Sequence, residues 1–240
     1  MPIIASSALT HAGLRRNINE DAIVNLPDQG LWVVADGMGG HSKGDYASQA
    51  ITRALEDLTI VKDQDLSQYL LTVAHCVRSV NDHLVVRSTE LDSGVIGATL
   101  AALVVDGCEC GIIWVGDSRV YRLRDGIFKQ LTVDHSFVNE LIDQGNLSIE
   151  EASSHPDANA ITRAVGASND LKLDQKIETV LSGDRYLLCS DGLYRDVTDS
   201  NMEEAMISSS TCEETRDCLL KLALDSGGKD NISLVVVDAK

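Results

Sequence analysis

One stretch of the sequence, from Ala98 to Gln130, restricts the fold more than any other. It holds consecutive apolar, β-rich segments with no helical periodicity between them, at 98–105, 111–115 and 119–124. Asp106-Gly107 and Asp125-Gly126 punctuate the stretch, and such pairs are typical of hairpin turns because they tolerate positive φ. Strands that follow one another through tight turns pair in antiparallel fashion. The stretch therefore predicts antiparallel sheet and argues against a parallel βαβ fold.

Helical periodicity occurs in separate blocks of the sequence. Apolar residues recur at helical spacing from Gly44 to Leu58 and again from Leu66 to Leu84, and we expect both helices to pack on the core. Two capping boxes mark further helix starts: Ser148…Glu151 and Thr211…Glu214. Other apolar runs predict strands at 31–35, 185–189 and 232–237. Strands and helices grouped in this way predict a layered α+β architecture.

No boundary of composition divides the 240 residues, so we expect a single domain over 1–240. Residues 134–168 have the least regular pattern. A long irregular segment inside a compact domain is usually functional, and we expect this one to form a flap over a site.

The chain is strongly acidic, with 20 Lys and Arg against 37 Asp and Glu and a formal charge of −17. Nucleic acids and anionic membrane surfaces attract clustered basic residues, so neither is an expected partner. No stretch approaches the roughly 20 apolar residues of a membrane span, and the first seven residues lack the basic segment of a signal peptide. Six cysteines without a CxxC pair indicate reduced thiols. These features predict a cytoplasmic protein, and none requires more than a monomer.

Four aspartates stand at the ends of predicted core strands, each in a segment that contains glycine: Asp36, Asp117, Asp191 and Asp230. Carboxylates gathered at strand ends repel one another unless cations lie among them. Oxygen ligands without histidine or cysteine suit magnesium or manganese better than zinc. Taken singly, each Asp-Gly pair is an ordinary turn, but the set of four indicates a metal site.

The sequence lacks the motifs of three other common cation, phosphate or nucleophile sites. No segment supplies the acids of an EF-hand loop with its closing glutamate. The segment from Asp36 to Gly40 lacks the Lys-Ser/Thr of a phosphate-binding loop, and no GxSxG nucleophile elbow occurs. These absences favour a metal-bound water as the nucleophile.

The order of the motifs resembles the metal-dependent Ser/Thr protein phosphatases, the type 2C or PPM family, in their short bacterial form. The resemblance extends from about residue 8 to residue 238 and rests on seven segments. These segments are Arg16-x-x-Asn19-Glu20-Asp21, Asp36-Gly37-Met38-Gly39-Gly40-His41, Gly116-Asp117-Ser118-Arg119, Leu131-Thr132-x-Asp134-His135-Ser136, Ile161-Thr162-Arg163-Ala164-Val165-Gly166, Ser190-Asp191-Gly192 and Lys229-Asp230-Asn231-Ile232-Ser233.

The resemblance implies a four-layer α-β-β-α sandwich, two antiparallel sheets flanked by helices, with two Mn²⁺ or Mg²⁺ ions at one end. Asp36 would bridge both ions, and Gly37 would contribute its carbonyl oxygen. Asp191 and Asp230 resemble the other direct ligands of one ion. Glu20-Asp21 would act on the second ion, partly through ordered waters.

Two ions that share a water lower its pKa, and the resulting hydroxide would attack phosphorus in line. Arg16 offers a planar fork for phosphate oxygens, and it has the family's spacing to Glu20, which the competing Arg15 lacks. His41 is the candidate general acid for the leaving alkoxide, with a metal-bound water as the alternative. His135 is assigned a structural role.

Two positions depart from the pattern of related sequences. Position 195, four residues beyond Asp191, often carries an acid in relatives and is arginine here. A third, weaker ion held by Asp117 with Asp191 is therefore less secure, and Arg195 would modulate that ion or touch the substrate. Position 38 is Met where animal members place a histidine, so their general acid has no counterpart here.

The sequence thus predicts a phosphatase acting on phosphoserine and phosphothreonine proteins, opposed to a bacterial Ser/Thr kinase. Two alternatives remain at this point. One is a binding protein that recognises phosphoproteins without turnover, and the other is a two-metal hydrolase of small phosphoesters.

Overall fold

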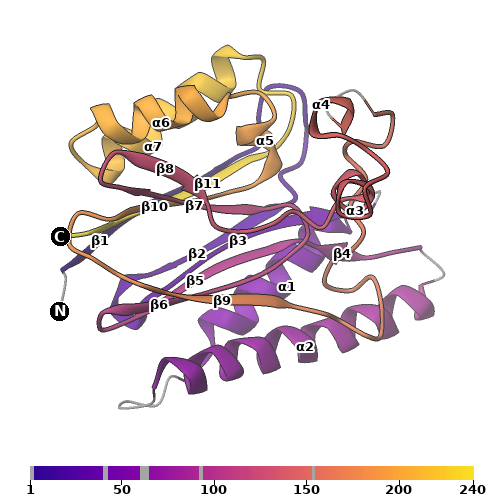
Figure 1. The fold of residues 1–240 in the computed structure, drawn as a ribbon. Coiled ribbons are helices and arrows are strands. Elements are labelled where there is room, and N and C mark those ends of the chain that lie inside the picture. Colours follow the sequence, from indigo (N-terminus) through magenta and orange to yellow (C-terminus); the bar gives the residue numbers. More distant parts are fainter. Residues whose placement is uncertain (1–2, 40–42, 60–64, 92–93, 153–154) are drawn as a thin grey trace.

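The computed structural model describes residues 3–39, 43–59, 65–91, 94–152 and 155–240, and its core is a pair of antiparallel sheets (Figure 1). The first sheet has the order β1 (Ile4–His11), β11 (Ile232–Ala239), β10 (Arg185–Cys189), β7 (Arg119–Arg124) and β8 (Ile127–Gln130). The second has the order β2 (Asp21–Leu26), β3 (Leu31–Met38), β5 (Leu100–Asp106), β6 (Glu109–Val115) and β9 (Asp174–Thr179), with β4 (Gly97–Ala98) paired to β3.

Helices cover the outer face of each sheet, which makes four layers (Figure 1). Helices α1 (Gly44–Glu56) and α2 (Leu66–Glu90) pack on the second sheet, and α6 (Asp199–Ser208) and α7 (Cys212–Asp225) pack on the first. The short α5 (Asp191–Tyr194) contacts β10 and β11. The expected four-layer α-β-β-α sandwich is therefore confirmed.

The alternation of side chains along β3 explains why its sequence is continuously apolar. Leu31, Val33 and Ala35 face the helices α1 and α2, whereas Trp32 and Val34 face the first sheet. Successive side chains of a strand point to opposite faces, so a strand buried on both faces has no polar alternation. The layer between the sheets adds Leu103, Ile112, Tyr186, Leu188 and Val235.

The turns and caps follow the chemistry of the sequence. Asp125 and Gly126 both have positive φ, 52° and 75°, and they join β7 to β8 as expected for Asp-Gly. Ser148 and Thr211 cap helices as predicted: Glu151 N donates to Ser148 Oγ at 3.3 Å and Glu214 N donates to Thr211 Oγ1 at 3.1 Å.

The segment 134–168 contains two short helices, α3 (Phe137–Asp143) and α4 (Ile149–Ala152). They lie at the end of the sandwich opposite the C-terminus (Figure 1). Among the helices of the described ranges, none combines the length and the apolarity that crossing a membrane would require.

Candidate functional site

Five aspartates from both sheets meet at the same end of the sandwich as α3 and α4. Asp36 lies near the end of β3, and Asp21 at the start of β2 is its antiparallel partner. Asp117 follows β6, Asp191 follows β10 and begins α5, and Asp230 precedes β11 by two residues. In antiparallel sheets the carboxyl end of one strand lies beside the amino end of its neighbour. Loops distant in sequence therefore converge here.

The aspartates are close enough to change one another's protonation. Burial, followed by the negative charges of Asp21 and Asp191, raises the pKa of Asp36 well above its ordinary 3.8. Burial raises the pKa of Asp21 to about 6 and that of Asp191 to about 7, where Arg195 partly opposes the rise. Burial also raises the pKa of Asp117. Such a cluster is unfavourable as a set of anions unless cations compensate it.

The donors of this cluster fit hard divalent cations, because all of the side chains offer carboxylate oxygens. Asp21 Oδ1 is buried and has no hydrogen-bond partner among the described residues, although Ser190 Oγ donates to Asp21 Oδ2 at 2.8 Å. An unpaired buried acceptor is costly, and an ion would satisfy it. Across the described ranges, no three acidic, histidine or cysteine side chains already surround one point at ligand spacing. We therefore expect the carboxylates to adjust when an ion binds.

Two arginines bring positive charge to the cluster. Arg16 Nη2 donates to Asp230 Oδ2 at 2.7 Å, and the Arg16 side chain is 52% exposed. Arg195 pairs through Nη1 with Asp191 Oδ2 at 2.7 Å and through Nη2 with Asp117 Oδ2 at 3.0 Å. Arg16 thus lies at the rim beside a predicted ligand, whereas Arg195 lies between two of them.

Glu20 and Gly37 stand between this cluster and helix α1. Gly37 N donates to Glu20 O at 3.1 Å, and Gly44 N donates to Glu20 Oε1 at 3.2 Å. A Cβ atom at position 37 would overlap the carbonyl oxygens of Gly44 and Glu20, so only glycine fits there. The structure therefore places every predicted ligand position at one end of the sandwich: Glu20, Asp21, Asp36, Gly37, Asp117, Asp191 and Asp230.

The two histidines singled out from the sequence have different outcomes. His41 lies outside the described residues, so its predicted role as general acid stays a prediction. His135 is buried, and its Nδ1 accepts from Gly116 N at 3.1 Å while its Nε2 lies 3.1 Å from Asp174 Oδ2. It thus contacts the loop that carries Asp117, in agreement with a structural role.

Sequence reasoning missed the residues that hold the acidic loops in place. Asn231 is buried; its Oδ1 accepts from Glu20 N at 2.8 Å, and its Nδ2 donates to the carbonyl oxygens of Ala12 and Ile18 at 3.0 and 2.9 Å. It therefore clamps the loop that carries Arg16 against the loop that carries Asp230. The sequence signal for Asn231 was its position directly after Asp230 in the Lys229–Ser233 motif.

Thr99 performs a similar task on the other side of the cluster. Its Oγ1 accepts from Asp36 N at 3.0 Å, its N donates to Asp36 O at 2.8 Å, and its Oγ1 lies 2.6 Å from Ser118 Oγ. These bonds tie the backbone of Asp36 to the segment that follows Asp117. No pattern in the sequence pointed to Thr99.

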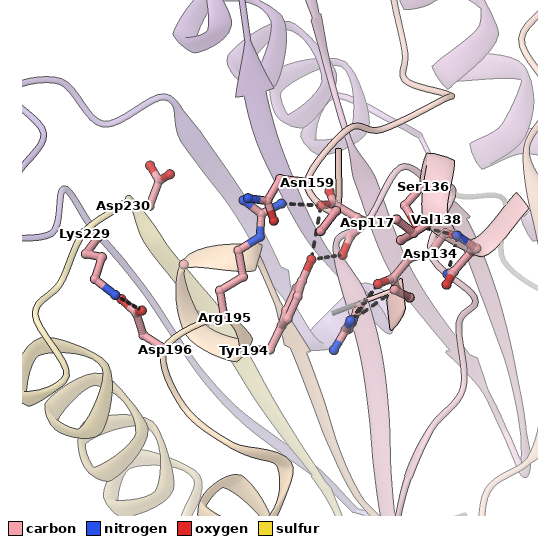
Figure 2. A pocket seen from close by; sticks show the side chains of 15 residues that line it. Asp117, Asp134, Ser136, Val138, Asn159, Tyr194, Arg195, Asp196, Lys229 and Asp230 are labelled. Atoms are coloured by element: carbon pink, nitrogen blue, oxygen red, sulfur yellow. Dashed lines mark hydrogen bonds and ion pairs between the residues drawn. The ribbon is translucent and has the colours of Figure 1, made fainter. Parts of the chain in front are cut away.

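A cavity of about 700 Å³ opens beside the cluster (Figure 2). Asp117, Arg195 and Asp230 line one part of it, and Val138 and Ala152 of the 134–168 segment line another. Figure 2 shows Tyr194 directed at Asp117, and Tyr194 Oη donates to Asp117 Oδ2 at 3.2 Å. The cavity therefore gives a ligand access to the acidic cluster past the proposed flap.

A two-sheet sandwich with clustered carboxylates at one end and an arginine at its rim agrees with the architecture that the resemblance to the metal-dependent phosphatases implies. Comparison with known families assigns it: the chain belongs to the protein phosphatase 2C family, whose family model matches residues 13–224.

Individual relatives agree with this assignment. The serine/threonine phosphatase Stp of Listeria monocytogenes is 36% identical over 238 residues, which cover 95% of this chain and 93% of that protein. PstP of Mycobacterium tuberculosis is 37% identical over 98% of this chain, which spans only 45% of PstP.

Solved structures carry the same fold. PppA, described as a key regulatory component of T6SS in Pseudomonas aeruginosa, superposes with a TM-score of 0.91 at 38% identity, over 99% of this chain and 98% of that one. The catalytic domain of PstP in complex with two manganese ions superposes with a TM-score of 0.86 at 35% identity, over 99% of each chain. The chain is therefore a phosphatase, and the comparisons support metal dependence.

Proposed function

We propose that this phosphatase hydrolyses phosphoserine and phosphothreonine in proteins, with two Mn²⁺ or Mg²⁺ ions held by its acidic cluster. The observation that carries the proposal is the close approach of five aspartates at one end of the sandwich. The negative charges of the other four all raise the pKa of Asp36. Metal-dependent hydrolysis of phosphate esters is favoured because the chain belongs to a phosphatase family and its acidic cluster needs cations. Relatives named as serine/threonine phosphatases support the substrate class.

The proposed ligands divide into two groups around Asp36, which would contact both ions. Asp191 and Asp230 would hold one ion, Glu20 and Asp21 would act on the other, partly through ordered waters, and Gly37 would contribute its carbonyl oxygen. When bound, the ions supply Lewis acidity, which activates a water and neutralises charge on the phosphate oxygens. The unpaired Oδ1 of Asp21 is the clearest acceptor in this set.

The chain's own residues would bind and orient the phosphate group. Arg16 pairs with Asp230 through one Nη atom, and its half-exposed guanidinium has further N–H donors for a phosphate oxygen. His41 would donate a proton to the leaving Ser or Thr oxygen. The 134–168 segment would control access, since its residues line the cavity.

The natural counterpart of this activity would be a bacterial Ser/Thr kinase, because a protein phosphatase needs an enzyme that supplies its substrate. We propose that the protein acts as a monomer in the cytoplasm on the substrates of such a kinase.

Phosphate release from a phosphothreonine peptide tests the proposal. The chelated enzyme should show no turnover, and added Mn²⁺ or Mg²⁺ should restore it. Asp36→Asn should lower kcat/KM by about a hundredfold or more, because it removes charge where the transition state needs ions. Asp106→Asn is the matched control, since Asp106 is exposed and is the last residue of β5, at the end of that strand away from the cluster.

Turnover that survives both chelation and Asp36→Asn would refute the proposal. Two further measurements test the alternatives. Binding of Mn²⁺ by calorimetry without any hydrolysis would indicate a phosphoprotein-binding protein, and faster hydrolysis of a free nucleotide than of the peptide would indicate a small-phosphoester hydrolase.

A further inference from the structure

Arg195 bridges two aspartates of the acidic cluster. Its Nη1 lies 2.7 Å from Asp191 Oδ2, and its Nη2 lies 3.0 Å from Asp117 Oδ2. Both carboxylates are nearly buried, and the Arg195 side chain is 32% exposed at the wall of the cavity. A single guanidinium therefore pairs with both carboxylates, between which the third ion considered above would lie.

The backbone fixes this arrangement from the Asp191 side. Asp191 begins α5 and Arg195 is its C-cap, with Arg195 N donating to Asp191 O at 3.0 Å. Residues four apart on one turn of helix lie on the same face, so the guanidinium reaches the Asp191 carboxylate with little rearrangement. The ion pair with Asp191 is thus a local consequence of the sequence.

Tyr194 fixes the arrangement from the Asp117 side. Its Oη donates to Asp117 Oδ2 at 3.2 Å and lies 3.1 Å from Asp117 O. The guanidinium of Arg119 covers the Tyr194 ring at 3.5 Å, and Arg119 is itself paired with Asp134 at 2.7 Å. Asp117 Oδ2 therefore accepts from both Tyr194 and Arg195 (Figure 2).

We infer that Arg195 takes the place of a third cation between Asp117 and Asp191, so that this phosphatase binds two divalent ions per chain and not three. The inference rests on the proposed function, which supplies the other two ions. A third ion between these carboxylates would meet an adjacent guanidinium of like charge and would compete for Asp117 Oδ2 with the bond from Arg195. The residues present thus do not fit a third ion.

Arg195 also makes the neutralisation of this pair independent of the metal supply. An arginine side chain stays protonated at any physiological pH, whereas a weak third ion would be lost at low concentration. Only the two remaining sites would then respond to the metal available to the enzyme.

Counting bound ions tests this inference directly. The metal-stripped 240-residue chain is dialysed to equilibrium against a Mn²⁺ series up to millimolar concentration, and bound Mn²⁺ is measured by elemental analysis. The wild-type chain should saturate at two ions, as in the PstP catalytic-domain complex. Arg195→Glu should raise the saturating number to three, because it places a third carboxylate beside Asp117 and Asp191.

Two further variants control for charge and for folding. Arg195→Lys keeps the positive charge and should stay at two ions. Lys229→Gln removes another cation of the same cavity, one that is exposed and pairs with Asp196 at 2.6 Å, and it should also stay at two. Thermal unfolding of each variant identifies any that fail to fold, and the wild-type count does not depend on them.

The possible failures are distinguishable. Three ions on the wild-type chain, or only two on a folded Arg195→Glu variant, would overturn the inference about Arg195. Fewer than two ions on the wild-type chain would instead overturn the two-metal centre of the proposed function, together with the inference that rests on it.

Discussion

Asp21, Asp36 and Asp191 are held in surroundings that favour their protonated forms. Burial raises the pKa of Asp21 to about 6 and that of Asp191 to about 7, and it also raises the pKa of Asp36 well above its ordinary value. In the unfolded chain the same groups ionise near 3.8. Folding without ions therefore works against ionisation, and the stability of the protein depends on pH through these groups.

We predict that the metal-free protein loses stability as pH rises from about 4 to about 7. Over that range the folded state binds more protons than the unfolded state, so the free energy of unfolding falls with increasing pH. Each unit of raised pKa corresponds to about 1.4 kcal/mol. Bound Mn²⁺ should offset the loss, so the difference in Tm between loaded and chelated protein should widen with pH.

Thermal unfolding across this pH range, with and without chelator, provides the measurement. Metal-free Asp36→Asn should show a shallower pH dependence than the wild type, because one titrating group is gone. A metal-free Tm that is constant or rises between pH 4 and pH 7 would contradict the prediction.

At the scale of elements, the 134–168 segment is attached at both of its ends. At its start, His135 N donates to Gly116 O at 2.9 Å, and Thr162 N donates to His135 O at 2.9 Å. Just before its end, Gly166 N donates to Asn81 Oδ1 at 2.8 Å, and Asn81 Nδ2 donates to Ser168 O at 3.0 Å. Helix α2 therefore anchors the end of the proposed flap through one buried side chain.

Asn81→Ala should loosen that anchor. It leaves the Gly166 N–H without its partner, which we expect to lower the free energy of unfolding by about 1–3 kcal/mol. Hydrogen exchange of the amides at 164–168 should become faster. Gln68→Ala is the control, because Gln68 is exposed on the same helix. Unchanged exchange at 164–168 would show that Asn81 does not anchor the segment.

At the scale of the whole molecule, the charge of −17 opposes the approach of an acidic phosphoprotein. The ions and Arg16 must attract the phosphate locally, while the rest of the surface repels negative flanking residues. The overall field should therefore favour substrates with basic residues around the phosphorylation site.

We predict that a phosphothreonine peptide flanked by lysines has a higher kcat/KM than one flanked by glutamates. The ratio should fall towards one as salt rises from about 0.01 M to about 1 M, because the screening length falls from about 30 Å to about 3 Å. A peptide flanked by serines provides the neutral control. A preference that persists at high salt would indicate specific contacts instead of the overall field.

Much of the architecture was predictable from local patterns. Runs of apolar residues predicted the hairpin stretch from Ala98 to Gln130 and the buried strands β3, β10 and β11. Apolar residues at helical spacing predicted the helices α1 and α2. α2 extends to Glu90, past the predicted end at Leu84. The strands β1, β2 and β9 were missed. In β9 half-buried residues alternate with exposed ones, and the polar composition of the strand is like that of a loop.

Helix α6 was also missed, although Met202, Ala205 and Met206 are buried on one face. Their spacing is helical, but only two turns carry it, and the short apolar pattern is weak beside the surrounding polar residues. The cap at Thr198, whose Oγ1 accepts from Asn201 N at 3.3 Å, was the stronger available signal.

The sequence by itself determined which chemistry is present: the order of the acidic motifs, the hard oxygen donors and Arg16. It did so because residue type and spacing near a strand end are local properties. Only the tertiary structure decided which groups neutralise one another. Arg195 and Asp117 are 78 positions apart, and no periodicity relates them. Their contact exists because β6 and β10 end at the same edge of the sandwich, where the two sheets bring their loops together.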